Sequence, residues 1–96
     1  MARDQATVDC AAGAWTQLTN ADVVAITFQV IGDVAVYIRA TTDEATPTED
    51  YGLAFQSLDG KINRAMYDLF NLTGAARLWA KPIGDVRGAL VYVDHA

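Results

Sequence analysis

The chain has 96 residues, of which 52% are apolar, and this is enough material for one small core. Seven Lys and Arg residues stand against twelve Asp and Glu residues, giving a formal net charge of -5 at pH 7. Because the basic residues are also scattered singly, we expect no nucleic acid and no membrane as a partner. The sequence has no apolar run of membrane-spanning or signal-peptide length, so we expect synthesis in a cytoplasm.

Residues 1–14 contain little apolar material beyond Val8 and are predicted to form an N-terminal arm outside the core. The arm would be either a frayed terminus or a segment that binds a partner. Residues 15–96 would then form the folded domain. Because a domain of this size buries only about 60 to 65% of its unfolded surface, we also expect association with further copies.

Six stretches from residue 15 onward are rich in β-branched and aromatic residues, and turn residues separate most of them. They span residues 15–18, 23–30, 34–40, 53–57, 76–83 and 88–94. This density of strand signals predicts an all-β fold, namely a two-layer β-sandwich or jelly-roll-like domain.

The two stretches on either side of Gly32-Asp33 pose a question of parity, because the even-numbered residues are apolar in both 24–30 and 34–38. A two-residue hairpin would pair even with odd positions and send one apolar set into water. Either the loop has three residues and a bulge, or the two strands belong to opposite sheets joined by an arch. Both solutions predict a packed two-layer fold with the odd-numbered residues facing outward.

One segment has helical rather than strand spacing, with apolar residues at 62, 65, 66, 69 and 70. It predicts a short helix around residues 62–71, with Asp59 as candidate N-cap and Gly74 as candidate stop. Alternatively, residues 60–64 close a strand and only residues 66–70 form a turn or two of helix.

Residues 41–50, TTDEATPTED, are predicted to form an acidic surface loop. Its four carboxylates suggest calcium, but the regular spacing and the turn glycine of a calcium loop are absent, so we expect a solvated loop and no metal.

Catalytic chemistry has few candidates in this sequence. The one histidine, His95, is the penultimate residue, and the one cysteine, Cys10, lies in the predicted arm. No nucleophile elbow, phosphate-binding loop, zinc pattern or dinucleotide turn is present. The sequence therefore predicts no enzymatic activity and no cofactor.

Aromatic residues divide into two groups. Those within apolar runs are expected in the core, and they are Trp15, Phe28, Phe55, Phe70 and Trp79. Tyr37, Tyr51 and Tyr67 lie beside polar residues and are candidates for a recognition surface, since tyrosine is enriched at interfaces.

The order of strands and turns resembles that of small virion proteins of tailed bacteriophages, of the capsid decoration (cement) type. The pattern comprises Val36-Tyr37-Ile38 after a Gly-containing turn, Thr46-Pro47-Thr48 and Gly52, Arg77-Leu78-Trp79-Ala80, and a last strand ending Val91-Tyr92-Val93-Asp94-His95-Ala96. The resemblance covers about residues 15–96 and contains no diagnostic motif.

The resemblance implies a virion protein that binds the major capsid protein on the outside of the head, as a trimer, and stabilises the shell. Partner-binding residues are chosen by position, in or beside the arm or on a polar strand face, and they are Arg3, Asp4, Trp15, Tyr37 and Tyr51. Two alternatives remain: a phage tail or fibre module that binds a host-surface glycan, and a small β-sandwich interaction domain from outside viruses.

Overall fold

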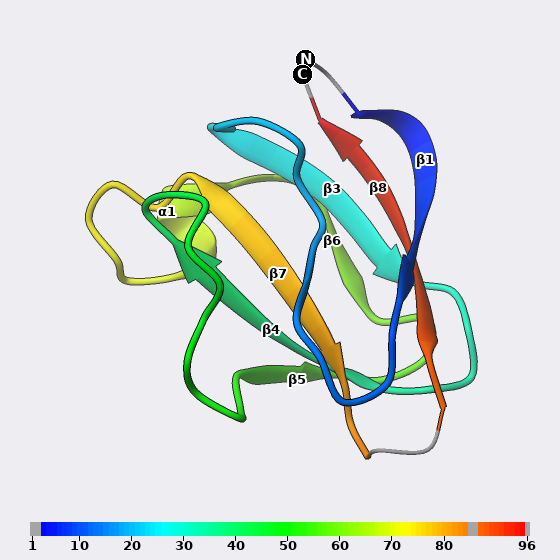
Figure 1. Ribbon diagram of the computed structural model, residues 1–96. Coiled ribbons are helices and arrows are strands. Elements are labelled where there is room, and N and C mark those ends of the chain that lie inside the picture. Colours follow the sequence, from blue (N-terminus) through cyan, green and yellow to red (C-terminus); the bar gives the residue numbers. More distant parts are fainter. Residues whose placement is uncertain (1–2, 85–86, 96) are drawn as a thin grey trace.

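The structure, a computed structural model, describes residues 3–84 and 87–95 (Figure 1). It contains eight strands and one short helix, in the order β1 Arg3–Cys10, β2 Thr16–Gln17, β3 Ala25–Val30, β4 Val36–Thr41, β5 Leu53–Phe55, β6 Gly60–Ala65, α1 Met66–Leu69, β7 Arg77–Pro82 and β8 Ala89–His95. In this described part, no helix has the length and apolar character needed to cross a lipid bilayer.

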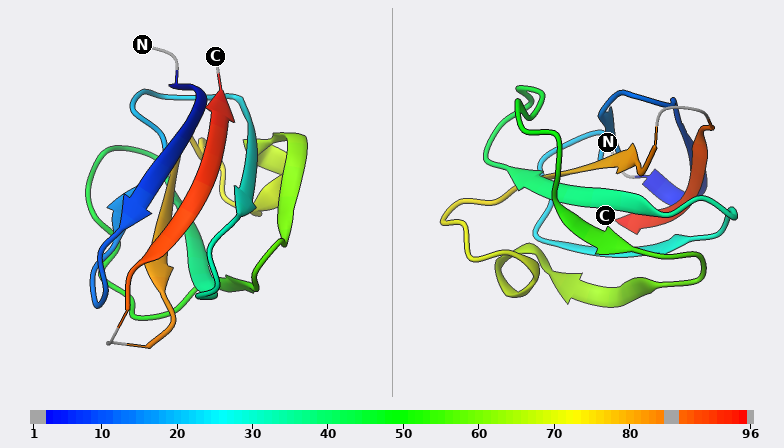
Figure 2. Two further views of the ribbon diagram at one scale, coloured as in Figure 1. Left: turned by 90° about the vertical axis from the view of Figure 1, so that its right-hand side faces the viewer. Right: turned by 90° about the horizontal axis from the view of Figure 1, so that it is seen from below.

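The strands form two four-stranded antiparallel sheets, sheet A in the order β1-β8-β3-β6 and sheet B in the order β2-β7-β4-β5. Figure 2 (left) looks onto sheet A, with sheet B behind it. The first strand pairs with the last, the second with the seventh, the third with the sixth and the fourth with the fifth. This nested pairing across two packed sheets is the strand topology of a jelly roll, so the predicted β-sandwich of jelly-roll-like form is confirmed.

The core lies between the sheets and answers the parity question. Phe28 and Val30 of β3 face it from sheet A, and Val36 and Ile38 of β4 face it from sheet B, all at most 1% exposed. The two strands therefore belong to opposite sheets joined by an arch, which was one of the two predicted solutions. Val24 is the exception, because it precedes β3 and is 83% exposed.

The prediction of an N-terminal arm outside the core has to be corrected, because Arg3–Cys10 form strand β1 at one edge of sheet A. The strand pairs along its length with β8, where Val8 lies opposite Val91 and Cys10 opposite Ala89. Val8 and Cys10 belong to the buried core. The prediction was wrong because small inward residues give a weak signal, while the strand is stabilised by pairing with a distant segment.

The predicted helix around residues 62–71 is shorter than expected. Gly60–Ala65 form β6, the edge strand of sheet A, and only Met66–Leu69 are helical. Asp59 is not an N-cap, because its carboxylate accepts a hydrogen bond from the Gln56 amide in the preceding turn. The alternative of a strand followed by one helical turn is the one that the structure contains.

The inward and outward assignments of Val36 and Val24 can be tested by making the same change at both. Val36→Thr introduces a hydroxyl into the apolar core, and we expect the free energy of unfolding to fall by about 1 to 3 kcal/mol. Val24→Thr places the hydroxyl in water, and we expect a change within about 0.5 kcal/mol. Urea unfolding of both variants measures the difference, and equal effects would contradict the assignment.

Burial raises the pKa of the Cys10 thiol to about 11, with a smaller contribution from the neighbouring Asp9 carboxylate. Because the folded protein then holds this proton more tightly than the unfolded chain, Cys10 stabilises the fold less as pH rises from about 9 to about 11. We expect the difference in unfolding free energy between the protein and its Cys10→Ala variant to shrink over that interval. A difference that is independent of pH would contradict the expectation.

Candidate binding face on sheet B

Three of the predicted partner-binding residues gather on the outer face of sheet B. Tyr37 on β4 lies opposite Lys81 on β7. On its other side β7 pairs with β2, where Thr16 lies opposite Ala80. Because the two strands are antiparallel, continuing this register places Trp15, the residue before Thr16, next to Lys81. Trp15 and Tyr37 thus flank Lys81, and Tyr51 approaches the same face from the loop before β5. We call this set of side chains the sheet B face.

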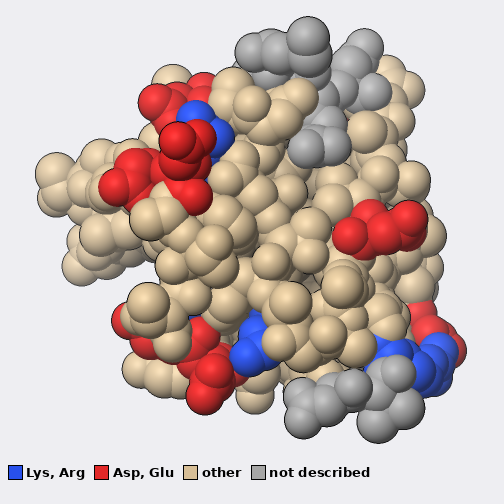
Figure 3. Space-filling model, viewed as in Figure 1, with Lys and Arg blue, Asp and Glu red and all other residues tan. Residues whose placement is uncertain are grey.

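The acidic loop of residues 42–50 folds back over the sheet B face, and basic side chains of that face hold it through ion pairs. Glu49 forms an ion pair with Arg39 at 3.5 Å, and Asp50 forms one with Lys81 at 3.4 Å. The Trp15 indole N–H donates a hydrogen bond of 2.7 Å to the Glu49 carbonyl oxygen. Figure 3 shows acidic side chains gathered on the left of this view, with basic ones beside them. The predicted acidic loop is therefore bound to protein cations on the sheet B face.

Tyr51 is positioned by Arg39 and by a close backbone approach. The Arg39 guanidinium donates a hydrogen bond of 2.9 Å to the Tyr51 carbonyl oxygen and lies 5.3 Å from the centre of the Tyr51 ring. Gly52 makes this approach feasible, because a Cβ at this position would lie 2.5 Å from the carbonyl oxygen of Ile38. The Tyr51 ring remains 62% exposed, so it is fixed in place yet accessible.

A groove of about 540 Å³ begins beside Tyr51. One wall is formed by Ile38–Ala40 of β4 and by Tyr51–Leu53, and the other by Leu69 to Leu72 at the end of α1. Its lining is mainly aliphatic and aromatic, with Arg39 and Asn71 as polar side chains. Such a lining suits an apolar group of a partner better than a highly hydroxylated ligand.

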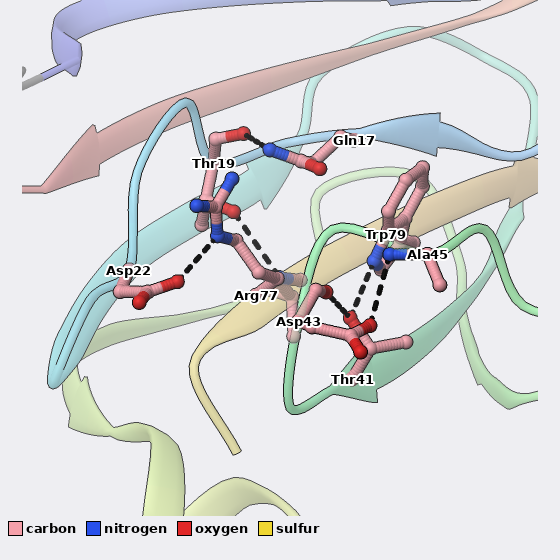
Figure 4. Close-up of polar contacts among 9 residues, drawn as sticks. Gln17, Thr19, Asp22, Thr41, Asp43, Ala45, Arg77 and Trp79 are labelled. Carbon is pink, nitrogen blue, oxygen red and sulfur yellow. Dashed lines mark hydrogen bonds and ion pairs between the residues drawn. The ribbon is translucent and has the colours of Figure 1, made fainter. Parts of the chain in front are cut away.

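The base of the acidic loop is fixed by polar contacts that were not predicted (Figure 4). The Trp79 indole N–H donates a hydrogen bond of 2.8 Å to the Thr41 hydroxyl at the end of β4. Next to it, the ion pair of Arg77 with Asp22 at 2.7 Å joins β7 to the loop before β3. Trp79 is buried, as expected of a core residue, but it lies opposite Arg39 and outside the core cluster between the sheets. It is buried because the loop covers it.

The other predicted aromatic core residues divide by environment. Phe28 and Phe55 are in the core, and Phe70 packs against it. Trp15 is partly exposed on the sheet B face and is not a core residue. The side chains of Arg3, Asp4 and Tyr67 lie outside the part of the molecule that the structure describes.

Cys10 and His95 lie at opposite ends of the β1–β8 ladder, opposite Ala89 and Arg3 respectively. Six residues of extended strand separate these ends, which corresponds to roughly 20 Å. Within the described ranges, no three His, Cys, Asp or Glu side chains are grouped as a metal site would require.

The ion pair with Arg87 lowers the pKa of the exposed Asp33 carboxyl. Asp33 lies in the arch between β3 and β4, away from the sheet B face.

Comparison of the chain with protein-family models, with curated proteins and with solved structures finds no match in any of the three. The sheet B face and the groove are therefore the features from which a function can be inferred.

Arg39 is expected to control the order of the acidic loop. Arg39→Gln removes its ion pair with Glu49 and its contact with the Tyr51 ring, so amide hydrogen exchange over residues 42–52 should become faster. Because such pairs are near the surface, the free energy of global unfolding should fall by only about 1 kcal/mol.

The matched control is Arg87→Gln, which removes the ion pair with Asp33 elsewhere on the surface. It should leave exchange over residues 42–52 unchanged. Equal exchange in this segment for both variants would show that Arg39 does not hold the loop.

Proposed function

We propose that this protein is a non-enzymatic virion protein that binds the outside of an assembled tailed-phage head and stabilises it. The observation that carries the proposal is a jelly roll that holds Trp15, Tyr37 and Tyr51 on one outer face. Jelly rolls recur in viral capsid domains, and tyrosine and tryptophan are the side chains that protein interfaces favour. The sequence resemblance to decoration proteins supports the same class of function.

The sheet B face suits repeated binding to one kind of partner because it is preorganised. The Trp15 side chain is held by its bond to the Glu49 carbonyl oxygen and Tyr51 by Arg39, while strand pairing fixes the backbone of Tyr37. Side chains that are fixed before binding lose less conformational entropy when the complex forms. The partner in this proposal is the major capsid protein.

Stabilisation would arise by cross-bridging. A copy that contacts two neighbouring shell subunits adds its own contacts to those that must break before the subunits separate. We expect the protein to act as a homo-oligomer, in keeping with the trimer implied by the resemblance, since several linked copies bind more tightly than one. The separation of Cys10 from His95 supports a binding role over a catalytic one.

The second candidate is a tail or fibre module that binds a host-surface glycan, and the observation in its favour is the exposed Tyr51 ring at the mouth of a groove. Sugar rings stack on such aromatic faces, and lectin domains also use jelly rolls. Against it stands the mainly apolar lining of the groove, because a glycan needs many hydrogen-bonding groups.

The shell-binding proposal predicts that particles which lack the protein release their DNA at lower temperature than complete particles. Release can be followed with a DNA-binding dye during heating, and adding back the purified protein should restore the transition. Particles that never contain the protein, or whose transition is unchanged by its loss, would contradict the proposal.

A variant of the sheet B face makes the same test residue-specific. Tyr37→Ala should weaken particle binding by at least about tenfold, as expected when a central interface aromatic is truncated. Ile83→Ala, on the loop after β7, is the control and should bind normally. If instead the isolated protein binds strongly on a glycan array, and Tyr51→Ala abolishes that binding, the second candidate is favoured.

A further inference from the structure

Leu58, in the turn between β5 and β6, combines two features that are unfavourable in an isolated chain. Its φ is 72°, in the left-handed region where glycine and asparagine are preferred. Its side chain is 69% exposed. The backbone is held in this conformation, since the Leu58 N–H donates to the Val30 carbonyl at 2.6 Å and its own carbonyl accepts from the Gln29 side chain at 3.0 Å.

Ile62 on β6 extends this apolar surface. It is 82% exposed, and it lines the same hollow as Leu58 and Tyr92 on the outer side of sheet A. Figure 2 (left) shows β6 at the edge of sheet A opposite β1. We call Leu58, Ile62 and Tyr92 the β6 patch. Exposed aliphatic side chains in one cluster, one of them on a strained backbone, indicate a surface that is covered in the working protein.

The charges around the β6 patch differ from those of the rest of the chain. Among the basic side chains that the structure describes, Lys61 and Arg64 form no ion pair, and both belong to β6. The other described basic side chains are paired with Asp or Glu. The patch is therefore flanked by positive charge that no ion pair among the described residues neutralises.

The groove beside Tyr51 has the complementary character. Its lining is mainly apolar, and the basic lining residue Arg39 is paired with Glu49. Asp68 directly precedes the groove residue Leu69 on α1. Asp68 is exposed and forms no ion pair within the described residues. A mainly apolar hollow with an unpaired acid beside it matches an apolar patch that is flanked by unpaired cations.

We propose that the β6 patch of one copy docks into the Tyr51 groove of a second copy of this chain. Two copies of an acidic protein repel each other overall, so a stable contact has to place cations against acids, and this arrangement does so. The two surfaces are different, so the contact is heterologous and, when the rotation closes, produces a ring. Edge-to-edge pairing of β6 is disfavoured because β6 pairs irregularly with β3 and Asn63 has a φ of 46°.

This inference deepens the proposed function by assigning the contact that makes the homo-oligomer. It rests on the oligomeric state proposed above and is independent of shell binding, because it concerns the isolated protein. It also leaves Trp15 and Tyr37 available for the shell.

Sedimentation equilibrium of the purified chain, over a range of concentrations, tests the contact. We expect Leu58→Gly to weaken self-association by at least about tenfold, as loss of a central apolar contact does. Its melting temperature should be equal or higher, because glycine relieves the strain at this φ. Ile62→Thr should weaken association as well, whereas Ile83→Thr, on the loop after β7, should not.

A mixing experiment tests the heterologous arrangement. The Leu58→Gly/Ile62→Thr variant retains the groove, and Leu72→Asp retains the β6 patch, so each alone should be monomeric and an equal mixture should form a heterodimer. A chain that is monomeric at every concentration, an oligomer that Leu58→Gly and Ile62→Thr leave intact, or a mixture without heterodimers would overturn the proposal. Particle binding of the double variant is then measured separately, so failure of this contact is distinguishable from failure of shell binding.

Discussion

The constraint on which this structure depends is that alternate residues of consecutive strands fill one shared interior from opposite sides. Phe28 of β3 and Phe55 of β5 meet there edge to face across the two sheets, with ring centres 5.1 Å apart. Because β3 and β4 lie in opposite sheets, their inward residues are fixed together, and their outward residues are fixed as a consequence. Tyr37 lies on the sheet B face because its neighbours Val36 and Ile38 are both fully buried.

The sequence was sufficient where inward residues were large and alternated with polar ones. The strand stretches containing Phe28, Ile38 and Val91 were predicted correctly, and so was the two-layer fold. It was insufficient for β1, whose inward residues Val8 and Cys10 are few and small and whose partner β8 is distant in sequence. Pairing energy of that kind is a property of the tertiary structure and leaves little local signal.

The ambiguity over β6 has a different physical origin, because the spacing of its apolar residues is compatible with a helix as well as with a strand. Ile62, Ala65, Met66 and Leu69 have helical spacing, yet the segment up to Ala65 is a strand. Gly60 fits this strand, since a Cβ there would lie 2.0 Å from the carbonyl oxygen of Phe28. A close backbone approach of this kind cannot be inferred from hydrophobic spacing alone.

The candidate site was predictable in part. Tyr37 and Tyr51 were identified by residue type and polar neighbours, and the structure places both at the sheet B face. The contribution of Arg39 and Lys81 was not predictable, because it depends on the acidic loop folding back across the sheet. The same long-range folding explains why Trp79 is buried although it faces outward.

The jelly roll also separates the residues that build the core from those that cover the surface. Of the eight large apolar side chains described as exposed, five belong to residues 51–72, namely Tyr51, Leu53, Leu58, Ile62 and Leu72. Among its described side chains, the same segment supplies only Phe55 and Met66 to the buried core cluster. Its strands β5 and β6 are the edge strands of their sheets, so each is paired along one side only. A binding surface made of edge strands and their turns can change in sequence while the central strands keep the fold, and this separation allows a small domain to specialise in association.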